Sequence, residues 1–148
     1  MPSETIAIAS DHGGFELKAL LKAQLQDLGY AVLDLGPDDA GSVDYPDFAY
    51  ALVTALRDGR ASRGVLMCGT GIGVSIAANR YPNIRAALVH DAFTARLCRE
   101  HNDANVLCFG GRTIGPDVAK DCLRIYLETE FESRGRHSRR VGKLSCPV

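Results

Sequence analysis

Short apolar runs alternate along this chain with longer segments in which apolar residues recur every three or four positions. The short runs are typical of buried strands, because turn residues end them before a helix could form. The longer segments have the spacing of one face of a helix. The predicted strands are residues 5–9, 31–35, 65–67, 86–89 and 106–109. The predicted helices are residues 15–28, 48–56, 74–80, 92–99 and 116–127.

This alternation of strand and helix predicts an α/β protein with a parallel sheet and helices on both faces. We expect a three-layer α/β/α sandwich with a five-stranded, Rossmann-like sheet. A length of 148 residues suits one domain over residues 1–148 that can bury a substantial core. Its last part, residues 133–148, is a basic C-terminal tail with little apolar periodicity.

Composition and charge narrow the class of protein. The hydrophobic content of 46% is ordinary for a soluble globular domain, and the net charge of −1 provides no general field for nucleic acid or an anionic membrane. The N-terminus has no signal-peptide pattern, and no apolar run reaches membrane-spanning length. Five cysteines without C-x-x-C spacing favour a reducing, cytoplasmic location over a disulfide framework or a zinc site.

Glycine-rich polar loops follow three of the predicted strands. Residues 10–14 follow the first strand, residues 68–71 the third and residues 110–112 the fifth. Open parallel sheets bind ligands at the carboxyl ends of their strands. The three loops together therefore predict a ligand site at this edge of the sheet.

The loop after the third strand carries the strongest chemical signal. Cys68 and Thr70 alternate there with Gly69, Gly71 and Gly73, at the start of a helix. Free N–H groups at a helix start attract anions, and the same field favours a thiolate over a thiol. Cys68 is therefore a candidate base or nucleophile, and the alternative is a small buried structural residue.

Other polar residues have both structural and functional interpretations. Asp11 is either a helix N-cap or, with His12, a ligand for phosphate or hydroxyl groups. His101 is either a helix C-terminal residue or a general acid or base. Arg112 is either a solvated side chain or an anion ligand. The arginine-rich tail is a disordered segment, a weak nucleic-acid contact or a set of phosphate ligands that completes a neighbouring subunit's site.

Cofactor motifs are missing from the sequence. No histidine, cysteine and carboxylate residues have metal-ligand spacing, and the glycine loops contain neither G-x-G-x-x-G nor a Walker lysine. We therefore expect neither a metal nor a nucleotide cofactor.

Several blocks of this sequence, in one register over nearly the whole chain, closely resemble ribose-5-phosphate isomerase B. The same family includes isomerases of galactose 6-phosphate and allose 6-phosphate. The blocks are residues 10–18, 44–46, 68–73, 76–79, 99–103, 110–112 and 135–137.

The resemblance implies an aldose–ketose isomerase that interconverts ribose 5-phosphate and ribulose 5-phosphate through an enediolate, in the pentose phosphate pathway and without a cofactor. Cys68 resembles the base that moves a proton between C1 and C2, whereas some members use a glutamate at the position of Val74. Thr70 and the loop amides resemble the groups that steady the enediolate, and His101 resembles the acid that opens the sugar ring.

The resemblance also implies a substrate-binding set and an assembly. The binding residues would be Asp11, His12, Gly69, Gly71, Ile72, Gly73, Asn102, Arg112, Arg136 and Arg140. Arg139 lies next to Arg140, so the choice of phosphate ligand between them stays open. The expected assembly is a homodimer, or a tetramer, whose sites are shared between subunits, with no nucleic-acid or membrane partner. The alternatives are an isomerase of a six-carbon sugar phosphate and a non-catalytic sugar-phosphate-binding protein.

Overall fold

The computed structural model describes residues 4–148, and its centre is a parallel sheet of five strands. The strand order is β2-β1-β3-β5-β4. All five predicted strands are present within a few residues of their expected bounds. They are β1 (Thr5–Ser10), β2 (Ala31–Asp34), β3 (Arg63–Cys68), β4 (Ala86–Leu88) and β5 (Val106–Gly110).

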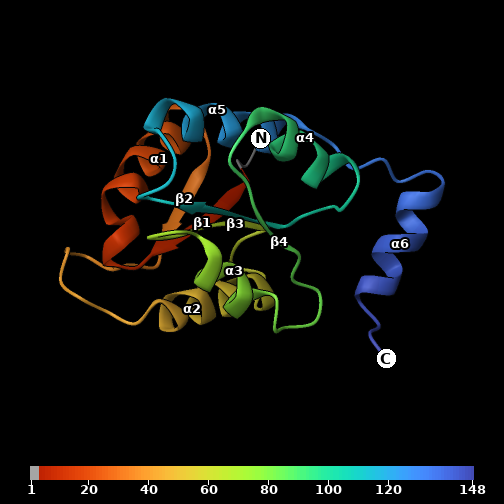
Figure 1. Cartoon of the computed structure of the whole chain (residues 1–148), viewed down its shortest axis with the longest axis horizontal. Helices are drawn as coiled ribbons and strands as arrows, with labels where there is room; N and C mark the ends of the chain where they lie inside the picture. Colours follow the sequence, from red (N-terminus) through yellow and green to blue (C-terminus); the bar gives the residue numbers. More distant parts are fainter. Residues whose placement is uncertain (1–3) are drawn as a thin grey trace.

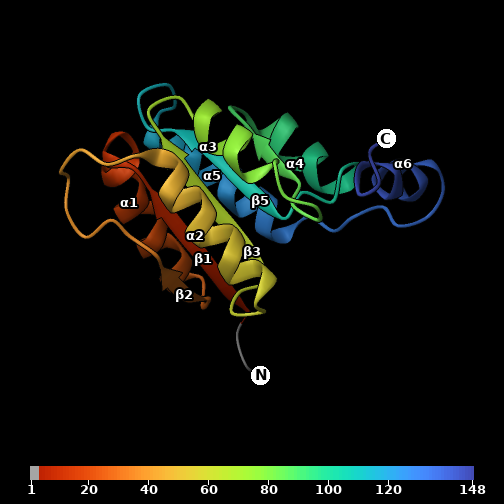
Figure 2. The same ribbon diagram turned by 90° about the horizontal axis from the view of Figure 1, so that it is seen from below.

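Helices cover both faces of the sheet, which confirms the predicted α/β/α sandwich (Figures 1 and 2). One face is covered by α1 (Phe15–Asp27), α4 (Ala92–Glu100) and α5 (Pro116–Glu128). The other face is covered by α2 (Tyr45–Arg57) and α3 (Ile72–Ala78). None of the helices in residues 4–148 combines the length and apolar character needed to cross a bilayer.

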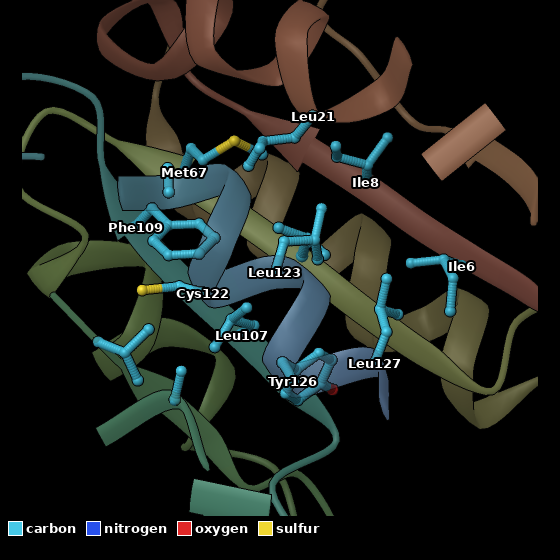
Figure 3. Packing of buried hydrophobic residues seen from close by; sticks show 14 of the residues in the cluster. Ile6, Ile8, Leu21, Met67, Leu107, Phe109, Cys122, Leu123, Tyr126 and Leu127 are labelled. Atoms are coloured by element: carbon cyan, nitrogen blue, oxygen red, sulfur yellow. The ribbon is translucent and has the colours of Figure 1, made fainter. Parts of the chain in front are cut away.

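Two apolar cores form because successive strand residues point to opposite faces. In β1, Ile6 and Ile8 face the layer of α1, α4 and α5, whereas Ala7 and Ala9 face α2 and α3. Figure 3 shows the first of these cores, with Leu123 of α5 among the side chains that pack over the sheet.

The C-terminal tail contains a helix that the apolar pattern did not predict. This helix, α6 (Arg136–Leu144), lies at the side of the molecule, apart from both layers (Figures 1 and 2). Arginine and lysine have good helix propensity, so a basic segment can be helical without an apolar face. Only His137 of α6 is buried, so the helix has few contacts with its own chain.

The chain reverses direction across the sheet between β1 and β3. The connection after β1 runs to α1 on one face, and the connection after β3 runs to α3 on the other. Such a switch point opens a crevice at the carboxyl ends of the two strands. The predicted loops of residues 11–14 and 69–71 flank this crevice.

Candidate active site

Backbone hydrogen bonds join the three glycine loops into one surface, which we call the glycine edge (residues 11–14, 68–73 and 110–112). The Asp11 N–H donates to the Met67 carbonyl at 3.1 Å. The Gly111 N–H donates to the Cys68 carbonyl at 2.8 Å, and the Arg112 N–H donates to the Gly69 carbonyl at 2.9 Å. The structure therefore brings the three predicted loops together.

The loops approach so closely that side chains would not fit between them. A Cβ atom at Gly13 would lie 2.9 Å from the Gly69 nitrogen, and one at Gly111 would overlap the Gly13 carbonyl oxygen. Glycine at these positions allows backbone groups to form the surface. The glycine edge is consequently built from main-chain atoms rather than from side chains.

Cys68 is the last residue of β3 and lies at this edge. Its side chain is almost buried, with the residue 5% exposed, but Thr70 and Ile72 beyond it are exposed. The Gly71 N–H donates to the Cys68 Sγ atom at 3.2 Å, in a turn where Gly71 has a φ of +77°. An N–H donor stabilises negative charge on sulfur, so this contact suits a thiolate.

The other buried thiols lie in the two cores. Burial raises the pKa of Cys98 to about 12 and that of Cys122 to about 11. Burial also raises the pKa of Cys108, which is completely enclosed. These three thiols remain protonated at neutral pH, which suits residues with a structural role.

Asp11 has the structural role that the sequence left open. Its Oδ1 atom accepts hydrogen bonds from the N–H groups of Gly13 at 2.8 Å and Gly14 at 3.2 Å. It thereby caps the short helix η1 (His12–Gly14). This cap holds the first loop in shape, and substrate contact by Asp11 stays a prediction.

Two neighbours of the glycine edge were not predicted as site residues. The Val43 N–H donates to the His12 Nδ1 atom at 3.2 Å across the sheet edge. The Tyr45 ring lies so close to Gly73 that a Cβ there would be 2.6 Å from the ring. Tyr45 lies in the resemblance block of residues 44–46, but the sequence gave no signal for the contact of Val43.

Arg112 adds a positive charge to the glycine edge. A Cβ atom at Gly69 would lie 3.2 Å from the Arg112 Nη1 atom, so the guanidinium group lies against the second loop. The main-chain N–H groups and this guanidinium group suit an anionic ligand.

The remaining predicted residues lie elsewhere in the chain. His101, Asn102 and Arg140 line a cavity of about 260 Å³ with His137, Val141 and Leu144. We call this cavity the α6 pocket. The topology places this pocket near the amino ends of the strands. The helix α4 begins after the carboxyl end of β4, runs back along the sheet and ends just before His101.

The α6 pocket and Cys68 therefore lie at opposite ends of the strands: the pocket at the amino ends, and Cys68 at the carboxyl ends. Asn105, four residues after His101, donates its N–H to the Arg85 carbonyl just before β4 begins. Cys68 instead pairs with Gly110 at the end of β5. The two ends are separated by the length of β5. Its five residues span about 13 Å from the first to the last Cα atom. The predicted residues form two groups in one chain.

The two histidines of the α6 pocket are stacked. The His101 and His137 rings lie 4.0 Å apart between centroids, at an interplanar angle of 11°. The His137 Nε2 atom is 3.8 Å from a carboxylate oxygen of Glu132. Burial and the positive charges of His101 and Arg136 lower the pKa of His137.

These residues form a group of potential metal ligands. Ligand atoms of His101, Glu132 and His137 lie within 4.8 Å of one another. However, an imidazole binds a metal in its own ring plane, and the stacked rings have nearly parallel planes. The two lone pairs therefore do not converge on one ion without a rotation of a ring.

One sizeable cavity lies away from the glycine edge. A cavity of about 630 Å³ is lined by residues such as Leu56, Tyr81 and Asn105 at the amino edge of the sheet. It contains none of the predicted site residues. We assign the site to the glycine edge because the thiol, the main-chain donors and Arg112 lie there together.

The fold and the glycine edge define an α/β protein with a thiol at the switch point of a parallel sheet. The Ribose/Galactose Isomerase family matches residues 6–144, and the chain belongs to this family. Ribose-5-phosphate isomerase B of Escherichia coli is 42% identical over 95% of this chain and 94% of its own length. D-erythrulose-4-phosphate isomerase of Pectobacterium atrosepticum is 43% identical over 88% of this chain and 87% of its own.

A solved structure agrees with the fold. Ribose-5-phosphate isomerase B of Clostridium thermocellum superimposes with a TM-score of 0.93 at 48% identity, over 95% of each chain. The resemblance noted from sequence blocks is thus confirmed across the whole fold.

Proposed function

We propose that this protein interconverts ribose 5-phosphate and ribulose 5-phosphate. The observation that carries the proposal is the position of the Cys68 Sγ atom, which accepts the Gly71 N–H at the glycine edge. Family membership supports the reaction class, since the Escherichia coli relative is named for this isomerisation. We place the reaction in the cytoplasm and in the pentose phosphate pathway, consistent with five free cysteines.

The chemistry requires a base, a way to stabilise charge on oxygen and an acid. The Cys68 thiolate takes the proton from C2 of the open-chain aldose, and the electron pair forms a C1–C2 double bond with negative charge on O1. The same thiol then returns the proton to C1, while the hydroxyl proton moves from O2 to O1. The N–H groups of the loop and the Thr70 hydroxyl hold the two oxygens, and one such donor contributes about 3 kcal/mol.

His12 and Arg112 bind the anionic substrate in this proposal. Arg112 lies against Gly69, so its guanidinium group is near the reacting end of the glycine edge. His12 is partly exposed beside the first loop. Together with the main-chain donors, these residues supply the positive and hydrogen-bonding groups that a sugar phosphate needs.

A partner subunit supplies the remaining residues. His101, Asn102, Arg136 and Arg140 cannot reach Cys68 of their own chain across the sheet, so we propose a homodimer, or a tetramer, with shared sites. His101 of the partner subunit would give a proton to the ring oxygen as the furanose opens. Exposed apolar residues support such an interface: Ile76 of α3 is 57% exposed and Leu144 of α6 is 59% exposed.

Replacement of the proposed base tests the function. We expect Cys68→Ala to lower kcat with ribose 5-phosphate by about 10³-fold, because the proton transfer loses its base. Cys146→Ala is the matched control, since Cys146 is exposed on the C-terminal segment. Ketose formation is measured by steady-state assay and ribose 5-phosphate binding by calorimetry. Wild-type turnover in Cys68→Ala would remove this thiol from the mechanism.

The Pectobacterium relative favours a second candidate substrate. It is named for a four-carbon ketose phosphate, and it covers 88% of this chain. One carbon changes selectivity by only about 10- to 200-fold. We therefore propose a comparison of kcat/KM for four-, five- and six-carbon aldose phosphates. Binding without turnover of any of them would instead indicate a sugar-phosphate-binding protein.

A further inference from the structure

We propose that Lys18 and Asp34 are positioning residues that anchor the loop of residues 35–44, so that the Val43 N–H holds His12 with its ring proton on Nε2. The inference deepens the proposed function and rests on it, because His12 is taken as a ligand of the sugar phosphate. The argument depends on one buried ion pair and on one contact between loops.

Lys18 is a buried cation that the isomerase chemistry does not use. It lies on α1 and is 4% exposed. Its Nζ atom donates to the Asp34 Oδ1 atom at 2.8 Å and to the Pro37 carbonyl at 2.9 Å. A buried ammonium group is tolerated only when such partners replace water. Both partners lie where β2 ends and the loop begins.

The Asp34 carboxylate accepts several hydrogen bonds at this end of the loop. Its carboxylate accepts hydrogen bonds from the Gly36 N–H at 2.9 Å and from the Lys22 Nζ atom at 3.0 Å, in addition to Lys18. Burial raises the pKa of Asp34, but these hydrogen bonds outweigh it and the net pKa is lowered. Asp34 is therefore ionised at neutral pH and fixes the backbone at Gly36.

The other end of the loop reaches the glycine edge. The Val43 N–H donates to the His12 Nδ1 atom at 3.2 Å. Between the two ends, residues 38–42 are exposed, and the Gly41 N–H bonds only to Asp39 within the loop. In Figure 1 this segment extends to the left, away from both layers, before it returns to α2. In this inference, the anchored base at one end and the start of α2 at the other limit where Val43 can lie.

The contact has a chemical consequence for His12. A neutral imidazole has one N–H donor and one acceptor nitrogen. Because a backbone N–H faces Nδ1, the geometry assigns the proton to Nε2. His12 thus presents its Nε2–H group to a substrate oxygen before the substrate arrives. Such preorganisation strengthens binding by removing the need to select one tautomer.

Lys18→Met tests the anchor, and Lys22→Met is its matched control. Lys22 bonds to the same carboxylate, but its side chain is 39% exposed and it has no hydrogen bond to the loop. The ring nitrogen chemical shifts of His12 report its tautomer, with the signals assigned by their loss in His12→Asn. We expect Nε2–H in the wild type and in Lys22→Met, and a mixture of tautomers in Lys18→Met. We also expect KM for ribose 5-phosphate to rise about tenfold in Lys18→Met, with kcat changed less.

Val43→Pro provides a second test if Lys18→Met does not fold. Proline removes the N–H that faces His12 and also fixes φ at residue 43, while the ion pair stays in place. The same tautomer mixture and the same rise in KM are expected, with an unchanged melting temperature. An Nδ1–H signal in the wild type, or wild-type signals in Val43→Pro, would overturn the inference. If the wild type lacks isomerase activity, the proposed function fails, whereas the nitrogen shifts still decide the tautomer.

Discussion

The glycine edge and the α6 pocket contain different kinds of structure. The glycine edge is made of main-chain atoms that bond to one another across three loops, such as the Gly111 N–H to the Cys68 carbonyl at 2.8 Å. The α6 pocket is lined by side chains of α6, whose only buried residue is His137, and by His101 and Asn102. The backbone of the first region is held together within one chain, whereas the second region has few contacts with its own chain. In our proposal, the two regions from different subunits form one site.

Complementation between inactive variants tests this difference with the largest expected effect. Cys68→Ala and His101→Asn should each be inactive alone. In mixed dimers, one site of each heterodimer regains both wild-type residues. Random assortment makes half of the dimers heterodimers, so about one quarter of wild-type activity should return.

The control for this experiment keeps both changes in one chain. A dimer in which both chains carry Cys68→Ala and His101→Asn has no complete site and should stay inactive. If the mixture of single variants stays as inactive as the double variant, the residues of the two regions do not form a shared site. Native mass spectrometry, with one variant carrying a tag that changes its mass, checks that subunits have exchanged.

Glycine substitutions distinguish the two regions by stability. Gly111→Ala places a Cβ against the Gly13 carbonyl oxygen, whereas nothing lies within 4 Å of a Cβ at Gly142 in α6. We expect Gly111→Ala to lower the free energy of unfolding by about 1–3 kcal/mol, because the backbone must move. Gly142→Ala should raise helix stability by about 1 kcal/mol. Urea denaturation measures the free energy of unfolding of both variants. Equal changes in the two variants would contradict the proposed difference between the two regions.

Acid should release α6 before it affects the sheet, and this is the smallest expected effect. The pKa of His137 is lowered from its ordinary value of 6.5 by burial and by His101 and Arg136. The unfolded segment therefore binds the proton more readily, so docking of α6 weakens as pH falls below 6.5. The pKa of Asp34 is lowered in the folded protein. Its contribution to the free energy of unfolding is therefore lost only as the pH falls below 3.8, the ordinary pKa of an aspartate.

Hydrogen exchange across this pH range separates the two events. Amides of α6 should lose protection between pH 6.5 and 5, while those of β1 and β3 keep theirs. His137→Phe should make the protection of α6 independent of pH in this range. If the amides of α6 and those of β1 and β3 lose protection at the same pH, α6 is coupled to the core.

Sequence patterns predicted the sandwich but not the helix at its side. The strands and the first five α-helices follow from apolar periodicity, and α3 begins only two residues before its expected start at residue 74. That earlier start follows from Gly71, whose positive φ completes the turn directly after Cys68. The helix α6 has only two aliphatic residues, Val141 and Leu144, so its sequence gives a weaker apolar stripe than the other helices.

The sequence by itself determined the order of strands and helices, the glycine loops and the thiol among them, because these depend on local spacing and on backbone freedom. The tertiary structure decided which of the candidate residues meet. It brought Val43 to His12 across 31 positions and stacked His101 on His137. Such contacts depend on how distant segments pack, and no local pattern encodes them. The same packing separates Cys68 from His101 by the length of a strand and so makes a shared site the natural proposal.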